Sequence, residues 1–301
     1  MVFNDWPLVI FSILAQLAVG TFVILGVVRL MTDSERRETA FFRLLNRGWI
    51  GSFVVVSIAL LISLLHLGSP LNAPLTVLNL GSAWLSREVL FGLLFALFAG
   101  LMALFQWRQI STQSIRDLLY GLGTVSGLGL IFSMSMIYRY VETQPAWNTP
   151  YTTVMFFLTA GVLGSLTVIV LMITNALFLK EDLKEAWYGR FLQGTIMTSL
   201  ILIGLDVLVY FFYVLGLFNG IPEAQATAQL LTNQFSILFV LRILFVLLGA
   251  VLGGLHLTRL MKTEKAKNLM VATIFAAFLL VLTSELISRF LFYAANVRIG
   301  I

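Results

Sequence analysis

Residues 63–90, SLLHLGSPLNAPLTVLNLGSAWLSREVL, join two long apolar segments and show how this protein is built. The stretch begins at the end of one apolar run, crosses a connection rich in Gly, Pro and Asn, and enters the next run through Ser86-Arg87-Glu88. His66, one of only 2 histidines in the sequence, stands near its start, and the carboxylate of Glu88 stands near its end. Ionisable residues at a membrane boundary are candidates for function.

The composition is that of a polytopic membrane protein. Of 301 residues, 59% are hydrophobic and 11% are charged, and the mean hydropathy is +0.98. A soluble domain has about 25% charged residues. The sequence has 0 cysteines, which excludes disulfides and cysteine-bound iron–sulfur clusters within it.

Apolar runs long enough to cross a membrane, about 20 residues each, occur eight times, and the class predicted is therefore all-α. Short connections join the runs, so we expect one domain over residues 1–301. The N-terminus lacks the basic region of a cleaved signal peptide, and the first run is expected to be retained. The predicted helices are 7–31, 48–67, 88–107, 117–140, 153–179, 191–218, 234–260 and 268–293.

Basic residues are concentrated in alternate connections, which predicts the orientation. Of the 19 Lys and Arg residues, 14 fall in one set of connections. This set comprises Arg29, Arg36, Arg37, Arg43, Arg47, Arg108, Arg116, Lys180, Lys184, Arg190, Arg259, Lys262, Lys265 and Lys267. The other set includes both termini and the 68–87 and 219–233 connections, and these are expected on the periplasmic side of a bacterial inner membrane.

His66 and Glu88 therefore meet at the outer boundary, as two groups able to exchange protons. A neutral histidine can accept a hydrogen bond from a hydroxyl group, and a carboxylate can take a proton, so the pair suits a two-electron, two-proton donor such as a quinol. Tyr138 and Arg139 end a predicted helix on the same side. The alternatives are an interfacial histidine bonded to loop carbonyls, and a first-turn carboxylate stabilised by the helix dipole after a Ser86 cap.

Four further charged residues lie inside predicted helices. Glu285 and Arg289 stand at i and i+4, so they can pair on one helix face, and Asp206 can pair with Arg242. Such pairs would hold helices in register. Alternatively, the four residues line the path of a secondary transporter, although all 6 prolines lie at helix ends or in connections, unlike the broken helices of many transporters.

Haem and metal sites are not expected. His256 falls near the inner end of its helix and His66 near the outer end of another, so the two histidines cannot hold a haem between them. His256 is predicted to be interfacial. The glycine pairs Gly123/Gly127 and Gly249/Gly253 are predicted to be close helix contacts.

Three motifs resemble a known family. WPLVIF at 6–11, HLGSPLNAP at 66–74 and LNLGSAWLSREVL at 78–90 are similar to the membrane anchor subunit of bacterial dimethyl sulfoxide reductase, the DmsC family. The resemblance implies an eight-helix anchor for a molybdenum-containing catalytic subunit and a four-cluster iron–sulfur subunit. It also implies oxidation of menaquinol near the periplasmic face, with electrons passed to the nearest iron–sulfur cluster.

The quinol-site residues expected from this resemblance are the histidine of HLGSP and the glutamate of SREVL, His66 and Glu88 here. Arg87, Tyr138 and Arg139 are added as candidate quinol-binding residues. The family anchor binds no haem, in agreement with the placement of the histidines. A secondary transporter and a purely structural anchor remain the alternatives.

Overall fold

The computed structural model describes residues 6–30, 39–66, 79–110, 112–179, 186–255, 264–295 and 297–300. All of the regular structure in these residues is helical, and eight helices are long and apolar enough to cross a membrane, which confirms the predicted class. They are α1 (Trp6–Leu30), α2 (Thr39–Ser63), α3 (Trp84–Arg108), α4 (Gln113–Arg139), α5 (Pro150–Leu179), α6 (Ala186–Phe218), α8 (Ser236–Leu255) and α9 (Glu264–Ala294).

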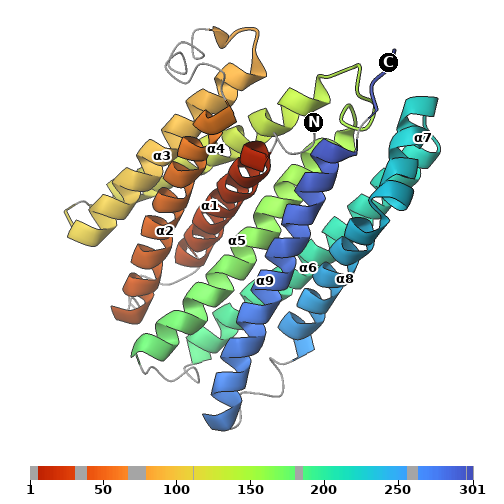
Figure 1. Ribbon diagram of the computed structural model, residues 1–301. Coiled ribbons are helices and arrows are strands. Elements are labelled where there is room, and N and C mark those ends of the chain that lie inside the picture. Colours follow the sequence, from red (N-terminus) through yellow and green to blue (C-terminus); the bar gives the residue numbers. More distant parts are fainter. Residues whose placement is uncertain are drawn as a thin grey trace.

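Two groups of helices meet along α1 and α5 (Figure 1). Helix α1 packs against α2, α4, α5 and α9, and α5 packs against α1, α2, α4, α6 and α9. The pairs α3–α4 and α8–α9 complete the two groups on either side. The first residues of α1 and the last residues of α9 lie at the same end of the bundle, which is the end where α3 begins and α4 finishes. We refer to it below as the terminal end.

Backbone-to-backbone contact joins α1 to α5. A Cβ atom added at Gly20 would overlap the carbonyl oxygen of Ala160, and one added at Gly164 would overlap the backbone of Gly20. Small residues allow this close approach, which is a common way to pack helices where no water drives them together. The sequence motifs did not single out this crossing.

Of the two predicted glycine contacts, the first is confirmed and the second is half right. Gly123 and Gly127 face Phe22 and Val19 of α1, each within 3.0 Å of a virtual Cβ. Gly249 meets α9 in the same way, but nothing lies within 4 Å of a Cβ at Gly253. Gly253 therefore takes no part in a close helix contact among the described residues.

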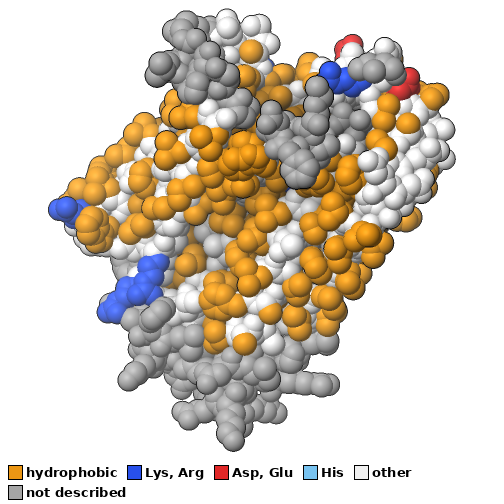
Figure 2. Space-filling view, viewed as in Figure 1, with side chains coloured by type: hydrophobic (Ala, Val, Ile, Leu, Met, Phe, Trp, Pro, Cys, Tyr) orange, Lys and Arg blue, Asp and Glu red, His pale blue; other side chains and the backbone are white. Residues whose placement is uncertain are grey.

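The outer surface is apolar over the middle of the bundle, as expected for contact with lipid (Figure 2). The side chains on the outside of α6 and α8 are large and exposed, among them Leu208, Phe211, Leu215, Ile237, Val240 and Leu247. The buried residues include many polar ones, so this surface reverses the usual pattern of a soluble protein. Such a surface is stable only when lipid covers it.

Residues 219–233, predicted as a connection between two spanning helices, do join α6 to α8, and they contain helical structure that the sequence did not predict. They contain α7 (Pro222–Gln229), which starts with Pro222 at a position where a missing N–H costs nothing, and the π-helix η5 (Leu230–Gln234). Helix α6 contacts α7, and η5 contacts α8. Ala224 and Ala228 are buried in a second, smaller core at the terminal end.

Candidate functional site

The start of α3 places Arg87 and Glu88. Arg87 donates from Nε to the carbonyl of Leu80 at 2.8 Å and from Nη2 to that of Gly81 at 2.9 Å. Its guanidinium also lies 4.1 Å from the ring centroid of Trp84. Arg87 thus holds the turn before the helix in place, and its donors are directed to that turn.

Glu88 lies one turn deeper than the sequence predicted. Helix α3 begins at Trp84, four residues before the predicted start, and its N-cap is Ala83, which makes no side-chain cap. Ser86 is a buried residue of the first turn. The alternative of a first-turn carboxylate behind a Ser86 cap is therefore wrong. Glu88 stands in the second turn, 8% exposed, and it points into the bundle.

Two phenol groups interact with this carboxylate electrostatically. The hydroxyl groups of Tyr138 on α4 and Tyr293 on α9 are 2.9 Å apart and share a hydrogen bond. Both phenols interact electrostatically with Glu88. The structure thus brings together Glu88 and Tyr138, two of the predicted site residues, and adds Tyr293. The sequence offered one signal for Tyr293, its spacing of four residues from Arg289.

Aromatic rings surround the phenol pair. Trp147 and Phe292 lie edge-on to Tyr138, with ring centroids 5.2 Å away in each case. The indole N–H of Trp147 donates to the carbonyl of Phe292 at 2.7 Å. The hydroxyl groups of Tyr138 and Tyr293 therefore lie among packed aromatic rings at the terminal end.

His66 is described only through its backbone. It ends the short 3-10 helix η3 (Leu64–His66), which continues α2 and contacts α1 near the terminal end. The His66 side chain, the connection 67–78 and His256 lie outside the described residues. Arg139 is half-buried and makes no hydrogen bond or ion pair with the part of the protein that is described.

A second group of buried charges lies between α6, α8 and α9. Asp206 and Arg242 form an ion pair of 3.1 Å between Oδ2 and Nη2, and they are 1% and 3% exposed. The guanidinium of Arg242 also lies 3.4 Å from the ring centroid of Tyr210. The predicted pairing of Asp206 with Arg242 is confirmed.

The predicted pairing of Glu285 with Arg289 is wrong. Glu285 Oε2 accepts a hydrogen bond from Thr159 on α5 at 2.7 Å. Arg289 donates from Nη2 to the side-chain carbonyl of Gln16 on α1 at 3.0 Å and stacks 3.7 Å from the ring centroid of Phe156. Both residues face the junction of α9 with α1 and α5, where partners on those helices are nearer than the helical neighbour.

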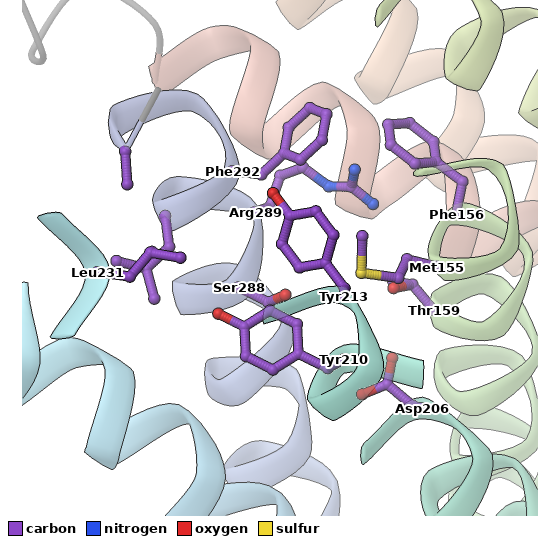
Figure 3. Close-up of a pocket in the computed structure, with 12 residues that line it drawn as sticks. Met155, Phe156, Thr159, Asp206, Tyr210, Tyr213, Leu231, Ser288, Arg289 and Phe292 are labelled. Carbon is purple, nitrogen blue, oxygen red and sulfur yellow. The ribbon is translucent and has the colours of Figure 1, made fainter. Parts of the chain in front are cut away.

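A small cavity adjoins this second group, between α5, α6, η5 and α9 (Figure 3). Its walls include Thr159, Asp206, Tyr210, Ser288 and Arg289. The space open to the centre of a water molecule is about 20 Å³, enough for one or two ordered waters.

Comparison with known proteins identifies the family. Residues 1–295 match the model of the family described as DMSO reductase anchor subunit (DmsC). The sequence is 26% identical over 301 residues to the C subunit of anaerobic dimethyl sulfoxide reductase from Escherichia coli K12, covering 99% of this protein and 96% of that one. It is 27% identical over 304 residues to the corresponding C subunit from Haemophilus influenzae, covering 98% and 96%.

A further relative, the YnfH subunit of anaerobic dimethyl sulfoxide reductase from E. coli K12, is 26% identical over 300 residues, with 99% of this protein and 96% of the relative covered. The protein belongs to the DmsC family of dimethyl sulfoxide reductase anchor subunits. It is a multi-pass membrane protein of the bacterial inner membrane, and eight helices in the described part of the protein are long and apolar enough to span that membrane. Its role is that of a membrane anchor subunit, and the transporter alternative gains no support.

Proposed function

We propose that this member of the DmsC family binds and oxidises menaquinol at the terminal end of the bundle, between α3, α4, α9 and the turn that ends at His66. The observation that carries the proposal is the buried carboxylate of Glu88 at the start of α3, which interacts electrostatically with the hydrogen-bonded phenols of Tyr138 and Tyr293. Among the described residues, no cation forms an ion pair with Glu88, and such a carboxylate is costly inside a membrane protein. A role in proton exchange accounts for its presence there.

The chemistry of quinol oxidation needs a hydrogen-bond acceptor, a proton acceptor and an exit for electrons. Neutral His66 would accept a hydrogen bond from one quinol hydroxyl. Glu88 would take a proton from the quinol and release it to the outer aqueous phase. Tyr138 would bind the head group through its hydroxyl. Each quinol that becomes a quinone gives up two electrons and two protons.

Electrons must leave through another subunit. The sequence has 0 cysteines, so it holds no cysteine-bound iron–sulfur cluster of its own. We propose that an iron–sulfur subunit docks on the periplasmic side, near the quinol site, and passes the electrons to a molybdenum-containing catalytic subunit. The basic residues gathered in the opposite set of connections support this orientation, with both termini in the periplasm. The whole protein, 1–301, would act as one domain.

Arg87 and Arg139 would have different roles within this site. Arg87 already donates to the carbonyls of Leu80 and Gly81, so we assign it to positioning the turn that leads into Glu88. Arg139 is half-buried at the same end and would bind a quinol oxygen or the partner subunit. His66, Glu88 and Tyr138 are the residues expected to touch the quinol.

Turnover with two electron donors tests the proposal. In membranes that carry the complete complex, His66→Leu and Glu88→Gln should abolish turnover with a menaquinol analogue. Turnover with an artificial dye, which delivers electrons directly to the other subunits, should stay at the wild-type level. The matched controls are His256→Leu, the other histidine, and Glu142→Gln, an exposed carboxylate just beyond α4.

Both controls should behave as wild type with either donor. Full quinol-dependent turnover in His66→Leu and Glu88→Gln would refute the proposed site. Loss of dye-dependent turnover together with loss of the complex from the membrane would make the protein a purely structural anchor at these positions.

A further inference from the structure

Three buried polar residues follow one another along a single face of α9. Glu285, Arg289 and Tyr293 are spaced four residues apart, and their exposed fractions are 1%, 5% and 9%. Eight residues of α-helix rise about 12 Å. This α9 stripe (Glu285, Arg289 and Tyr293) therefore runs from the terminal end of the bundle well into the membrane.

Each member of the α9 stripe binds a different helix. The carboxylate accepts from Thr159 on α5 at 2.7 Å. The guanidinium donates to Gln16 on α1 at 3.0 Å, and the phenol shares a 2.9 Å hydrogen bond with Tyr138 on α4. The guanidinium also interacts electrostatically with the carboxylate before it and the phenol after it. The stripe thus connects Glu285 with the phenol pair that interacts electrostatically with Glu88.

Buried polar atoms along the stripe require a further partner. Glu285 Oε1 and Arg289 Nε are buried and make no hydrogen bond with any described residue. Thr159, Ser288 and Arg289 line the cavity that has room for one or two waters. Buried polar groups are nearly always hydrogen-bonded to protein or to ordered water. Arg289 reaches the cavity directly and Glu285 through Thr159, so ordered water there is the partner that we infer for these atoms.

Glu285 differs from Asp206, the other deep carboxylate. Asp206 is held in an ion pair with Arg242, which neutralises it and gives it a structural role. Glu285 makes no ion pair with any residue that the structure describes, and its hydrogen-bond partner is a neutral hydroxyl. Glu285 does not line the cavity itself, but Thr159, its hydrogen-bond partner, and Arg289, which interacts with it electrostatically, both do. A carboxylate that is not fixed in an ion pair can gain and lose a proton with little rearrangement.

We propose that Glu285 is a second proton acceptor for quinol oxidation, connected to the quinol site through the α9 stripe. The inference rests on the proposed function. Oxidation of one quinol sends two electrons to the partner subunit, one proton to Glu88 and one proton to Glu285. The second proton passes by way of the Tyr293 hydroxyl and ordered water, while Arg289 stays charged and stabilises the Glu285 carboxylate between turnovers. The proton then leaves through the waters of the cavity, whose walls reach Ala295 at the terminal end.

Glu285→Gln tests the inference because it keeps the shape of the side chain and its hydrogen bond with Thr159. We expect the complex to assemble, to bind a fluorescent quinol-site inhibitor as wild type does, and to keep its dye-dependent turnover. Quinol-dependent turnover should fall by about 100-fold, as when a proton-transfer group is removed, and its solvent isotope effect should rise. Glu285→Asp, which can still ionise, should retain more turnover than Glu285→Gln.

Wild-type turnover and an unchanged isotope effect in Glu285→Gln would overturn the inference and leave Glu285 as a hydrogen-bond partner of Thr159. If Glu285→Gln does not assemble, Tyr293→Phe decides, because it removes only the hydroxyl of the stripe. Unchanged quinol turnover in that variant would also overturn the inference. Failure of the quinol site itself is a different result. In that case Glu88→Gln binds the inhibitor and oxidises quinol as wild type does.

Discussion

The hydroxyl groups of Tyr138 and Tyr293 lie 2.9 Å apart and join the ends of α4 and α9. The two residues are far apart in the sequence, yet their phenols meet, and both interact electrostatically with the buried carboxylate of Glu88. This hydrogen bond links α4, which packs on α3, to α9, which packs on α8. The two hydroxyl groups are also polar groups of the candidate quinol site.

Loss of one hydroxyl from this pair should destabilise the complex slightly. Tyr138→Phe keeps the ring contacts with Trp147 and Phe292, so the expected cost is that of one hydrogen bond, about 0.5–1.5 kcal/mol. Thermal unfolding of the purified complex measures this cost. Tyr140→Phe is the control because that side chain is exposed, and an equal shift in both variants would argue against a stabilising role for the pair.

Asp206→Asn should be much more damaging than a surface change. It leaves the guanidinium of Arg242 buried without its carboxylate, and breaking a buried pair in this way costs about 3–5 kcal/mol. We expect little of this variant in the membrane by immunoblot. The double variant Asp206→Asn/Arg242→Gln removes both charges and should restore much of the wild-type level of protein in the membrane. If the double variant is as scarce in the membrane as Asp206→Asn, the uncompensated charge of Arg242 is not the cause of the loss.

The α1–α5 crossing should tolerate no side chain at Gly164. A methyl group there overlaps the backbone of Gly20, and overpacking of this kind costs about 1–3 kcal/mol or more. Gly164→Ala should therefore lower the thermal stability of the complex. Gly121→Ala on α4 is the control, because nothing lies within 4 Å of the added Cβ. The thermal stability of this variant should equal that of wild type or be slightly higher. Equal stability of the two variants would contradict the close crossing.

Topology can be measured with reporter fusions. Because 14 of 19 basic residues fall in one set of connections, alkaline phosphatase fused after α9 should be active, as it is in the periplasm. The same enzyme inserted after α5, in the connection that carries Lys180 and Lys184, should be inactive. Activity at the second position and none at the first would reverse the proposed orientation.

Much of the fold could be predicted from the sequence because membrane helices are coded by local composition. Apolar runs of sufficient length located all eight spanning helices, since lipid accepts no other regular structure from such segments. Helix ends were less well predicted. Trp84 and Leu85 belong to α3, although the polar Ser86-Arg87-Glu88 triplet suggested a later start. Short polar segments such as 222–234 have no hydrophobic run, so α7 and η5 were missed.

The candidate site was only partly predictable because its partners come from distant helices. Spacing on one helix suggested that Glu285 binds Arg289, but the structure places Thr159 and Gln16 nearer. Tyr293 belongs to no sequence motif, and its role is visible only once the structure shows its hydroxyl group bonded to that of Tyr138 on α4. In contrast, Asp206 and Arg242 were paired correctly because two opposite charges inside a membrane protein have few other partners.

The most direct test of the quinol site is a titration of the fluorescent quinol-site inhibitor into membranes that carry the complex. Wild type should quench its fluorescence saturably. Glu88→Gln should weaken binding by roughly 10-fold or more, because losing a hydrogen bond to a charged group costs about 1.5–3 kcal/mol. His66→Leu should weaken binding by roughly 2-fold to 10-fold, because losing a neutral hydrogen bond costs about 0.5–1.5 kcal/mol. Glu142→Gln should match wild type. Equal affinity in wild type, Glu88→Gln and His66→Leu would place the quinol elsewhere and contradict the account.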